Sequence, residues 1–411
     1  MPVVLKICWG YWENASRDKR ELSAYREAGY ETIVMAAGNS KDCGRLGSID
    51  GFPVYFYSLK PFGDNCPIRI NQIISLLKWS RYAKRFKPDV ISGHDFTGWM
   101  IGWMSVMFRH KKPEFIYDSH EFEIGRNTKR SKLRSSIIQK IERFILGKSK
   151  FSIVVNESIA DEIQRAYKLS QRPIVIRNMP NYWDIDNSVC REVRVSFLKQ
   201  INKNLETEYD GKKKDGSEIG KNEVTPDFLV MYHGAIVPDR GIESLLSVVS
   251  RNPNISALVL GNGQEKYRDH LFGIVKELDI EKRVIFHEAV PLKELWKYLG
   301  AVDLSYSMIV GHSQSYFLSL PNKFFESIQS LTPIIASNFP EMTRVVDSYE
   351  IGLVCDPEDV EAINACVEKF RADKEFYDKC KQNLKIAKEE LCWEKESVKL
   401  KDAISQYLCN Q

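Results

Sequence analysis

Residues 319–337 read SLPNKFFESIQSLTPIIAS and predict a helix followed by a buried strand. A Pro-Asn-Lys turn opens the helical part, and a Thr-Pro break ends it before the β-branched run PIIAS. Amide groups at a helix N-terminus favour a phosphate, and Lys323 in the first turn adds a positive charge. Glu326 lies about one turn further on, where its carboxylate can accept hydrogen bonds from two vicinal ribose hydroxyls. An ordinary surface Glu–Lys pair explains the same spacing equally well.

Short β-branched runs alternate with longer amphipathic stretches on both sides of this segment. Such alternation is typical of parallel sheets with crossover helices, and it starts again near residue 228. The predicted fold class is therefore α/β, with two doubly wound Rossmann-like domains. The runs lie at 3–7, 32–37, 89–93, 115–119, 151–156 and 173–178, and then at 228–234, 255–261, 283–288, 303–307, 332–337 and 352–355.

Domain boundaries follow from the places where this alternation stops. We predict an N-terminal domain over residues 1–186 and a C-terminal domain over 227–390. Between them, residues 187–226 are predicted to be a linker or an inserted charged loop. The reason is that residues 199–226 contain twelve charges and five apolar side chains without a clear amphipathic period.

Charge and composition restrict the classes of function. The 411 residues include 59 Lys and Arg and 55 Asp and Glu, a net charge of +4 that argues against a nucleic-acid partner. That small total combines +10 over residues 1–186 (30 basic, 20 acidic) with −6 over 187–411 (29 basic, 35 acidic). The basic excess of the first domain favours an anionic acceptor or surface.

The cysteines and the hydropathy pattern predict a reducing, cytoplasmic location. Nine cysteines form no C-x-x-C pair and none has zinc-ligand spacing, so we expect no metal site. The lone D-x-D, Asp184 to Asp186, follows no strand and is interpreted as chance. The opening MPVVLKICWG is interpreted as a first strand rather than a secretion signal, and no apolar stretch approaches the roughly 20 residues of a membrane span.

A basic amphipathic helix is predicted over residues 126–150, where nine Lys and Arg accompany one acid. Leu133, Ile137, Ile141 and Phe144 recur at helical spacing. One interpretation is an apolar stripe that faces the core and a basic face in solvent. The other is a helix that contacts either a phosphorylated acceptor or the headgroups of an anionic membrane from the cytoplasmic side.

The order of motifs resembles the GT-B glycosyltransferases, in particular the family-4-like enzymes of group 1. The segment 319–337 matches their P-N-K-(L/F)-F-E pattern, followed by TPIIAS and GLVCDPED. Earlier matches are REAGYETIVMAAG at 26–38, KPDVISGHDFTGWMIG at 87–102 and FIYDSHEF at 115–122. The resemblance implies an N-terminal acceptor domain, a C-terminal nucleotide-sugar domain, and a C-terminal helix over 391–411 that returns to the first domain.

The resemblance also implies roles for individual residues. His120, the histidine of the DSHE motif at 118–121, would contact the donor sugar and act in catalysis together with Glu326. The donor would be held by the remaining matched positions, and a further group would lie on the acceptor side. The donor-binding candidates are Gly234, Arg240, Gly261, Gly263, Val290, Pro321, Asn322, Lys323 and Glu326, and the acceptor-side candidates are Asn14, Arg17, His94, Asp95 and Glu121.

Three positions depart from the family pattern. Leu318 stands where the family usually has a first glutamate that grips the sugar hydroxyls. Ala235 stands near the place of the first diphosphate arginine, and WENASRDKRE replaces an N-terminal Gly-Gly loop. The identity of the sugar therefore stays open.

The implied activity is a retaining, hexosyltransferase-type glycosyl transfer that needs no metal or other cofactor. The donor would be a nucleotide sugar, and the acceptor a glycan or a lipid-linked intermediate of bacterial capsule, lipopolysaccharide or exopolysaccharide synthesis. Two alternatives share the same sites. One is a GT-B epimerase that converts the sugar while it is nucleotide-bound, and the other is a catalytically silent nucleotide-sugar-binding protein.

Overall fold

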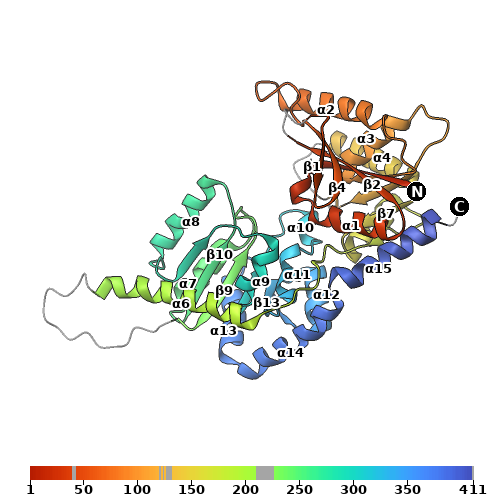
Figure 1. The fold of residues 1–411 in the computed structure, drawn as a ribbon. Coiled ribbons are helices and arrows are strands. Elements are labelled where there is room, and N and C mark those ends of the chain that lie inside the picture. Colours follow the sequence, from red (N-terminus) through yellow and green to blue (C-terminus); the bar gives the residue numbers. More distant parts are fainter. Residues whose placement is uncertain (39–42, 120–121, 124, 126–131, 210–225, 410–411) are drawn as a thin grey trace. The chain divides into compact units, whose positions relative to one another are not determined.

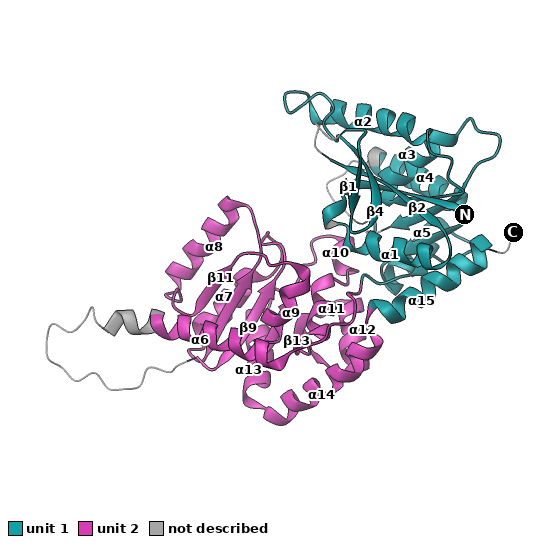
Figure 2. Cartoon of the chain, viewed as in Figure 1, with its two compact units in different colours: residues 1–178, 393–411 teal, residues 179–392 magenta. Residues whose placement is uncertain are grey.

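The computed structural model of the chain describes residues 1–38, 43–119, 122–123, 125, 132–209 and 226–409. The chain forms two compact units (Figure 2). The first unit contains residues 1–178 and 393–411, and the second contains residues 179–392. Both are α/β units built on a mainly parallel sheet (Figure 1), so the predicted fold class is confirmed.

The first unit has an eight-stranded sheet in the order β3-β4-β2-β1-β5-β6-β7-β8. All neighbouring strands are parallel except β3 and β4, which pair antiparallel. Strand β1 is central, and its Leu5 pairs with Ile33 on one side and Ile91 on the other. The strands are β1 (Val3–Tyr11), β2 (Glu31–Ala37), β3 (Leu46–Ile49), β4 (Phe52–Tyr57), β5 (Val90–His94), β6 (Glu114–Ser119), β7 (Phe151–Val154) and β8 (Ile174–Val175).

Helices cover both faces of this sheet (Figure 1). Helix α3 lies against β1, β5 and β6, between α2 and α4. It approaches β1 so closely that a Cβ at Gly98 would lie 2.3 Å from the carbonyl oxygen of Ile7, which explains the glycine. The helices are η1 (Trp12–Asn14), α1 (Ser16–Glu27), α2 (Ile68–Ala83), α3 (Asp95–Val106), α4 (Lys132–Lys148) and α5 (Glu157–Tyr167).

The C-terminal helix α15 (Trp393–Ile404) belongs to the first unit, as its resemblance to the family predicted. It packs on α1 and continues into η4 (Ser405–Cys409). Trp393, Leu400 and Ile404 are buried in one cluster with Trp12 and Tyr25. The apolar positions of a highly charged segment therefore complete the core of the opposite end of the sequence.

The second unit has a six-stranded, fully parallel sheet in the order β11-β10-β9-β12-β13-β14. Every residue of β9 and β10 is buried, as expected for strands covered on both faces. The strands are β9 (Phe228–His233), β10 (Ile255–Leu260), β11 (Val284–His287), β12 (Leu304–Ser307), β13 (Ile334–Ser337) and β14 (Gly352–Cys355).

The helices of the second unit connect these strands and continue beyond the last of them. They are α6 (Asn187–Tyr209), α7 (Ile242–Arg251), α8 (Glu265–Glu277), η3 (Leu292–Glu294), α9 (Leu295–Leu299), α10 (Gln314–Phe317), α11 (Asn322–Gln329), α12 (Pro340–Tyr349), α13 (Val360–Ala372) and α14 (Lys374–Glu390). In the part of the chain that the structure describes, no helix is long and apolar enough to cross a membrane.

The boundary between the units differs from the predicted one. The first unit ends at residue 178 rather than 186, and the segment predicted as a linker begins with the long helix α6. Val193, Phe197 and Ile201 recur every four residues along α6 and pack on the apolar cluster of the second unit. This apolar stripe, interrupted by many charges, makes residues 187–209 part of a domain. The rest of the predicted linker, 210–225, lies outside the described residues.

The structure of helix α4 contradicts part of one prediction, the apolar stripe that faces the core. Its buried side chains include Glu142, Ile145 and Leu146, and Glu142 accepts a hydrogen bond from the Tyr117 hydroxyl at 3.1 Å. Leu133 is instead 73% exposed and Ile137 49% exposed. An apolar stripe that faces the core is therefore wrong for the first half of α4.

Candidate functional site

The candidate donor site lies in the second unit, where the strand order reverses. From β9 the chain adds β10 and β11 on one side, and it then returns to place β12 on the other side of β9. Open α/β sheets bind ligands beyond the carboxyl ends of their strands at such a reversal. His233 ends β9, Met308 follows β12, and α11 begins nearby with Asn322.

Glu326 projects from α11 toward the end of β9. Its Oε2 lies 2.9 Å from Nε2 of His233, which is buried, and its side chain remains 15% exposed. Nδ1 of His233 has no hydrogen-bond partner among the described residues. The contact with His233 orients the carboxylate of Glu326, which solvent can still reach. Sequence reasoning missed His233, although it ends a predicted strand directly before Gly234.

Lys323 is buried beside Glu326, in the first turn of α11. Its Nζ donates a hydrogen bond to the carbonyl oxygen of Met308 at 3.1 Å and lies 4.6 Å from the centre of the Tyr232 ring. Burial, followed by the positive charge of Arg240, lowers the pKa of Lys323 to about 7, against the opposing effect of Glu326.

Arg240 belongs to the loop between β9 and α7. Its guanidinium carbon lies 5.0 Å from the centre of the Tyr316 ring. Its positive charge is close enough to Lys323 to lower the pKa of that lysine. Both neighbours, Asp239 and Gly241, have positive φ angles of 66° and 67°, so the loop turns sharply around it. The structure thus places two cations and the carboxylate of Glu326 around the start of α11.

Two of the three predicted glycines are explained by the backbone itself. A Cβ at Gly261 would lie 1.8 Å from the carbonyl oxygen of Gly234, and one at Gly263 would lie 2.2 Å from that of Ile236. The loops after β9 and β10 run side by side here, joined by a parallel bridge between Ile236 and Gly263, and only glycine allows so close an approach. Gly234 itself is exposed.

The other donor-side candidates occupy different places around these loops. Pro321 precedes the first residue of α11, and Asn322 is exposed there. Val290 is half-buried against the apolar cluster that includes α6. The neighbouring Ala289 amide donates to Oδ1 of Asn262, so the loops after β10 and β11 are joined.

The acceptor-side candidates belong to the first unit. His120 and Glu121 lie outside the described residues. Asn14 ends η1, and Asp95 begins α3 with a positive φ of 53°. Arg17 is buried, and its guanidinium donates to Glu21, Asp118 and the carbonyl oxygen of Ile176. The structure therefore gives Arg17 internal partners, and its acceptor contact stays a prediction.

Lys6 is the centre of the buried ionic network that holds Arg17. Its Nζ lies 2.7 Å from Asp18, 3.0 Å from Glu21 and 2.9 Å from Asp118, and all four side chains are at most 2% exposed. These acids are close enough together to suggest a cation site, but the ammonium group already lies among them. Sequence reasoning missed Lys6 because its strand otherwise consists of apolar residues.

His94 joins this network at the end of β5. Its Nδ1 lies 2.9 Å from Asp18, and its Nε2 lies 3.6 Å from Asp95. Burial opposes the charged form, but the charge of Asp18 and its hydrogen bond outweigh burial and raise the pKa of His94 to about 9. His94 is therefore an imidazolium at neutral pH.

This raised pKa predicts a dependence of stability on pH. Because the folded-state pKa lies above the unfolded value of about 6.5, the stabilisation is complete below that value and is lost as the pH rises through about 9. We expect the free energy of unfolding to fall by up to about 3 kcal/mol over this range. Denaturant titrations at several pH values measure it. In Asp18→Asn the fall should be much smaller, and an equal fall in that variant would contradict the assignment.

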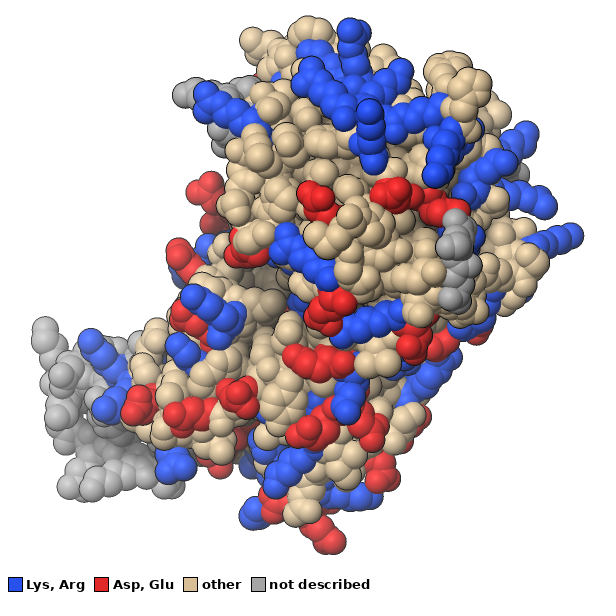
Figure 3. All heavy atoms as spheres, turned by 45° about the vertical axis from the view of Figure 1, so that its right-hand side comes forward, with Lys and Arg blue, Asp and Glu red and all other residues tan. Residues whose placement is uncertain are grey.

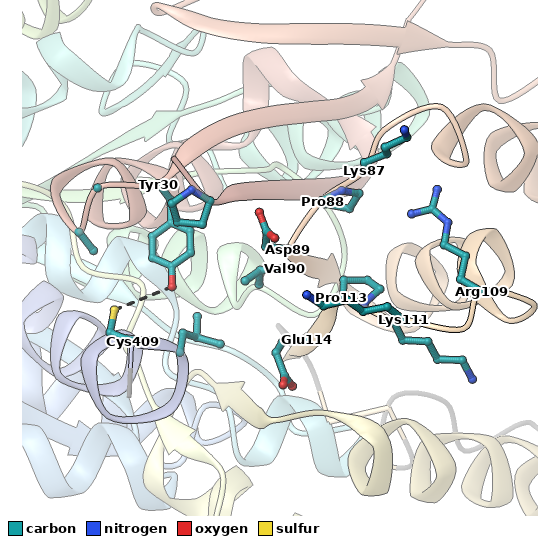
Figure 4. Close-up of a pocket in the computed structure, with 15 residues that line it drawn as sticks. Tyr30, Lys87, Pro88, Asp89, Val90, Arg109, Lys111, Pro113, Glu114 and Cys409 are labelled. Carbon is teal, nitrogen blue, oxygen red and sulfur yellow. Dashed lines mark hydrogen bonds between the residues drawn. The ribbon is translucent and has the colours of Figure 1, made fainter. Parts of the chain in front are cut away.

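A pocket of about 750 Å³ in the first unit lies away from these residues (Figure 4). It is at the amino ends of β1, β5 and β6, whereas His94 lies at a carboxyl end. Two of the charged residues that line it have internal partners: Asp89 accepts from the Val3 amide, and Arg109 donates to two backbone carbonyls. None of the predicted site residues that the structure describes lines this pocket.

The D-x-D pair has a structural explanation. Oδ1 of Asp186 accepts hydrogen bonds from the amide and the hydroxyl of Ser188, at the start of α6. Asp186 thus begins a helix, where Asp is a favoured residue.

Comparison with known proteins assigns the family. The model described as Glycosyltransferase Family 4 matches residues 20–179, and the model described as Glycosyl transferases group 1 matches residues 215–386. The chain belongs to the family-4-like glycosyltransferases of group 1, so the resemblance found in its motifs is confirmed.

A curated relative and several solved structures are similar to the chain. The lipopolysaccharide core biosynthesis glycosyltransferase LpsE of Rhizobium meliloti is 29% identical over 145 residues, which are 35% of this chain and 40% of that protein. Sucrose-phosphate synthase from Thermosynechococcus elongatus matches over 100% of both chains with a TM-score of 0.74 and 16% identity. Anabaena HepE in complex with UDP matches over 100% of both with a TM-score of 0.71 and 14% identity. These structural matches show the GT-B fold.

Proposed function

We propose that this chain transfers a sugar from a nucleoside diphosphate donor to a glycan or lipid-linked acceptor, with retention of the anomeric configuration. The observation that carries the proposal is the group formed by Lys323, Arg240 and Glu326 at the start of α11. Two cations and helix amides suit a diphosphate, and a solvent-accessible carboxylate suits a ribose. HepE, which has a similar fold, was crystallised with UDP and with UDP-glucose.

The chemical step would depend on charge stabilisation. Breaking the bond between the anomeric carbon and the diphosphate builds positive charge on the sugar and negative charge on the leaving phosphate. Lys323, Arg240 and the α11 amides would stabilise the phosphate, and they supply positive charge without a metal ion. In the family the leaving phosphate is thought to accept the acceptor's proton on the same face. The proposal assigns that step, and the catalytic role of His120, by resemblance.

The acceptor is proposed from the charge of the chain and from its relative. LpsE is named for lipopolysaccharide core synthesis, and the basic excess over residues 1–186 suits an anionic, lipid-linked glycan. We therefore place the reaction in bacterial surface polysaccharide synthesis, on the cytoplasmic side. The predicted membrane contact through 126–150 includes residues 126–131, which lie outside the described part of the chain.

A donor screen tests the proposal. UDP, GDP, ADP and dTDP sugars are titrated into the protein by calorimetry, with Glu326→Ala, Lys323→Ala and the surface variant Lys374→Ala. We expect one base to bind, both site variants to weaken it by at least about tenfold, and Lys374→Ala to bind normally. No binding, or binding that survives both site changes, would overturn the site.

Product analysis separates the alternative activities. Incubation with donor alone should give slow hydrolysis, and addition of acceptor should give a glycoside with the anomeric configuration of the donor, read by NMR. Conversion of the sugar while it stays nucleotide-bound would indicate an epimerase. Nucleotide binding without hydrolysis or transfer would indicate the silent binding protein.

A further inference from the structure

Helix α2 has a mixed inner side, where polar groups are buried together with Trp79 and Ala83, and an outer side that leaves apolar residues in solvent. The side that faces the protein is fixed by polar groups: Asn71 donates to the carbonyls of Gly63 and Cys66, and Ser75 donates to those of Ser58 and Leu59. Trp79 is buried and donates from Nε1 to the Ser58 carbonyl. The hydrogen bonds of this inner side attach α2 to the loop before it.

The outer side of α2 is apolar. Ile70, Ile73 and Leu77 recur at spacings of three and four residues and are 46%, 60% and 52% exposed. Residues at such spacings share one side of a helix. Since α2 is already held by the buried residues and hydrogen bonds of its inner side, folding of the first unit does not explain an apolar row in solvent. Single exposed apolar residues are common, but a continuous row indicates a contact surface.

The sequence that contains this row is basic. Between Asp64 and Asp89 the sequence contains six Lys and Arg and no Asp or Glu. Most of these cations are exposed on α2 or directly after it, and Lys78 lies 5.2 Å from the ring of the exposed Phe62. The six are Arg69, Lys78, Arg81, Lys84, Arg85 and Lys87.

Exposed apolar and basic residues also occur on or next to the adjacent helices. Beyond the end of α3, Met107 and Phe108 are 44% and 83% exposed, and Arg109, Lys111 and Lys112 follow. Helix α3 packs between α2 and α4, whose Leu133 and Ile137 are exposed. Figure 3 shows Lys and Arg gathered on the first unit at the level of α2 and α3.

We propose that the α2 face, formed by Ile70, Ile73 and Leu77 with Lys78, Arg81, Lys84 and Arg85, docks on an anionic lipid bilayer. An interfacial helix buries its apolar row at the boundary of the acyl chains while its cations contact the headgroups. Basic charge without acids matches a continuous anionic surface. A symmetric dimer through this face would place the cations against their own copies, which disfavours a second copy as the occupant.

The docking surface is independent of sugar transfer. None of its residues belongs to the candidate donor site, and lipid binding can be measured without nucleotide or acceptor. Failure of vesicle binding would therefore overturn the α2 face alone and leave the transferase proposal standing. A protein that docks normally but transfers no sugar would overturn the transferase proposal and leave the α2 face standing.

Vesicle flotation of the full chain tests the proposal. The protein is mixed with vesicles of phosphatidylcholine and phosphatidylglycerol, or of phosphatidylcholine alone, at low and high salt. We expect binding only to the anionic vesicles and weaker binding at high salt, because salt screens exposed charges. Reversal of Arg81, Lys84 and Arg85 to Glu should reduce the partition coefficient about 100-fold or more. The variant Ile73→Gln/Leu77→Gln should reduce it about tenfold.

Matched variants in the second unit control for general effects of charge and hydropathy. The charge control reverses the exposed Lys266, Lys276 and Lys385, and the apolar control is Phe272→Gln/Ile386→Gln. Both should bind vesicles like the wild type, and circular dichroism should show every variant folded. Three results would overturn the proposal: no binding by the wild type, equal loss in the controls, or binding lost on reversal of Lys140 and Arg143 in α4 while the α2 variants bind normally. A concentration-dependent dimer that the Ile73/Leu77 variant abolishes, without vesicle binding, would assign the face to a second copy.

Discussion

Lys323→Ala is expected to lower kcat/KM for sugar transfer by about 10²- to 10³-fold, the usual effect of removing one preorganised group that stabilises charge in a transition state. The buried ammonium group lies at the start of α11, beside Glu326 and within reach of the charge of Arg240. Among the described residues, the counter-charge that acts on it is the carboxylate of Glu326, which already contacts His233. Donor binding would bring the diphosphate that the lysine needs, and the leaving group would carry more negative charge than the bound donor.

The pH dependence of donor binding tests the same residue without any turnover. In the free protein the pKa of Lys323 is about 7, because burial favours the neutral amine. A bound diphosphate favours the ammonium, so the pKa should rise on binding. About one pH unit above that value, the protein should take up nearly one proton with the nucleotide. Calorimetry in buffers of different ionisation enthalpy counts this proton, and binding should weaken as the pH rises above 7.

Lys381→Ala is the matched control for Lys323→Ala. Lys381 is also a lysine of the second unit whose pKa burial lowers, and its Nζ donates to the carbonyl oxygen of Leu331 at 2.6 Å. Its removal should change neither proton uptake nor nucleotide affinity. If Lys323→Ala retains the proton uptake of the wild type, another group carries the proton, and the assignment of Lys323 to the diphosphate is wrong.

Lys6→Ala is expected to destabilise the first unit by about 3–5 kcal/mol, because removal of one partner leaves uncompensated buried charge. Three carboxylates surround Nζ of Lys6 within 3.0 Å, and without Lys6 they would lose their central cation while Arg17 and His94 keep their contacts. The network joins α1 to strands β1 and β6. Its loss should therefore loosen the segment that leads from β6 toward His120 and reduce transfer as well.

Tryptophan fluorescence can follow this change in one unit. Six of the eight tryptophans lie in the first unit, and Trp183 and Trp296 lie in the second. The main fluorescence transition in denaturant should shift for Lys6→Ala, whereas Lys374→Ala, which removes an exposed pair with Asp378, should change stability by less than about 1 kcal/mol. An unshifted transition for Lys6→Ala would show that the network does not stabilise the fold.

Much of the fold could be predicted because parallel strands that are buried on both faces leave a local sign in the sequence. The runs at 228–234 and 255–261 correspond to β9 and β10 within a residue or two. Helix α6 was missed because charges obscure its apolar positions at 193, 197 and 201, whose partners lie on strands far along the chain. Burial of such a stripe depends on those partners and on nothing local.

The candidate site was predicted only in part. The pattern at 319–337 indicated Lys323 and Glu326, because residues at i and i+3 of a helix lie on the same side. His233 and Tyr232 come from another strand, and no spacing connects residues about 90 positions apart. The glycines at 261 and 263 were recognised, but their immediate reason is the close parallel approach of two loops, which the sequence does not reveal.

The sequence by itself determined the two α/β units, the family and the turn at the start of α11, because strand periodicity, turn residues and motif order are local properties. The tertiary structure decided what the buried charges do. It placed Lys6 among three acids, held Arg17 inside that network, brought His233 to Glu326, and turned the apolar row of α2 outward. Such facts depend on which strands become neighbours, and electrostatic and apolar contacts act across space rather than along the chain.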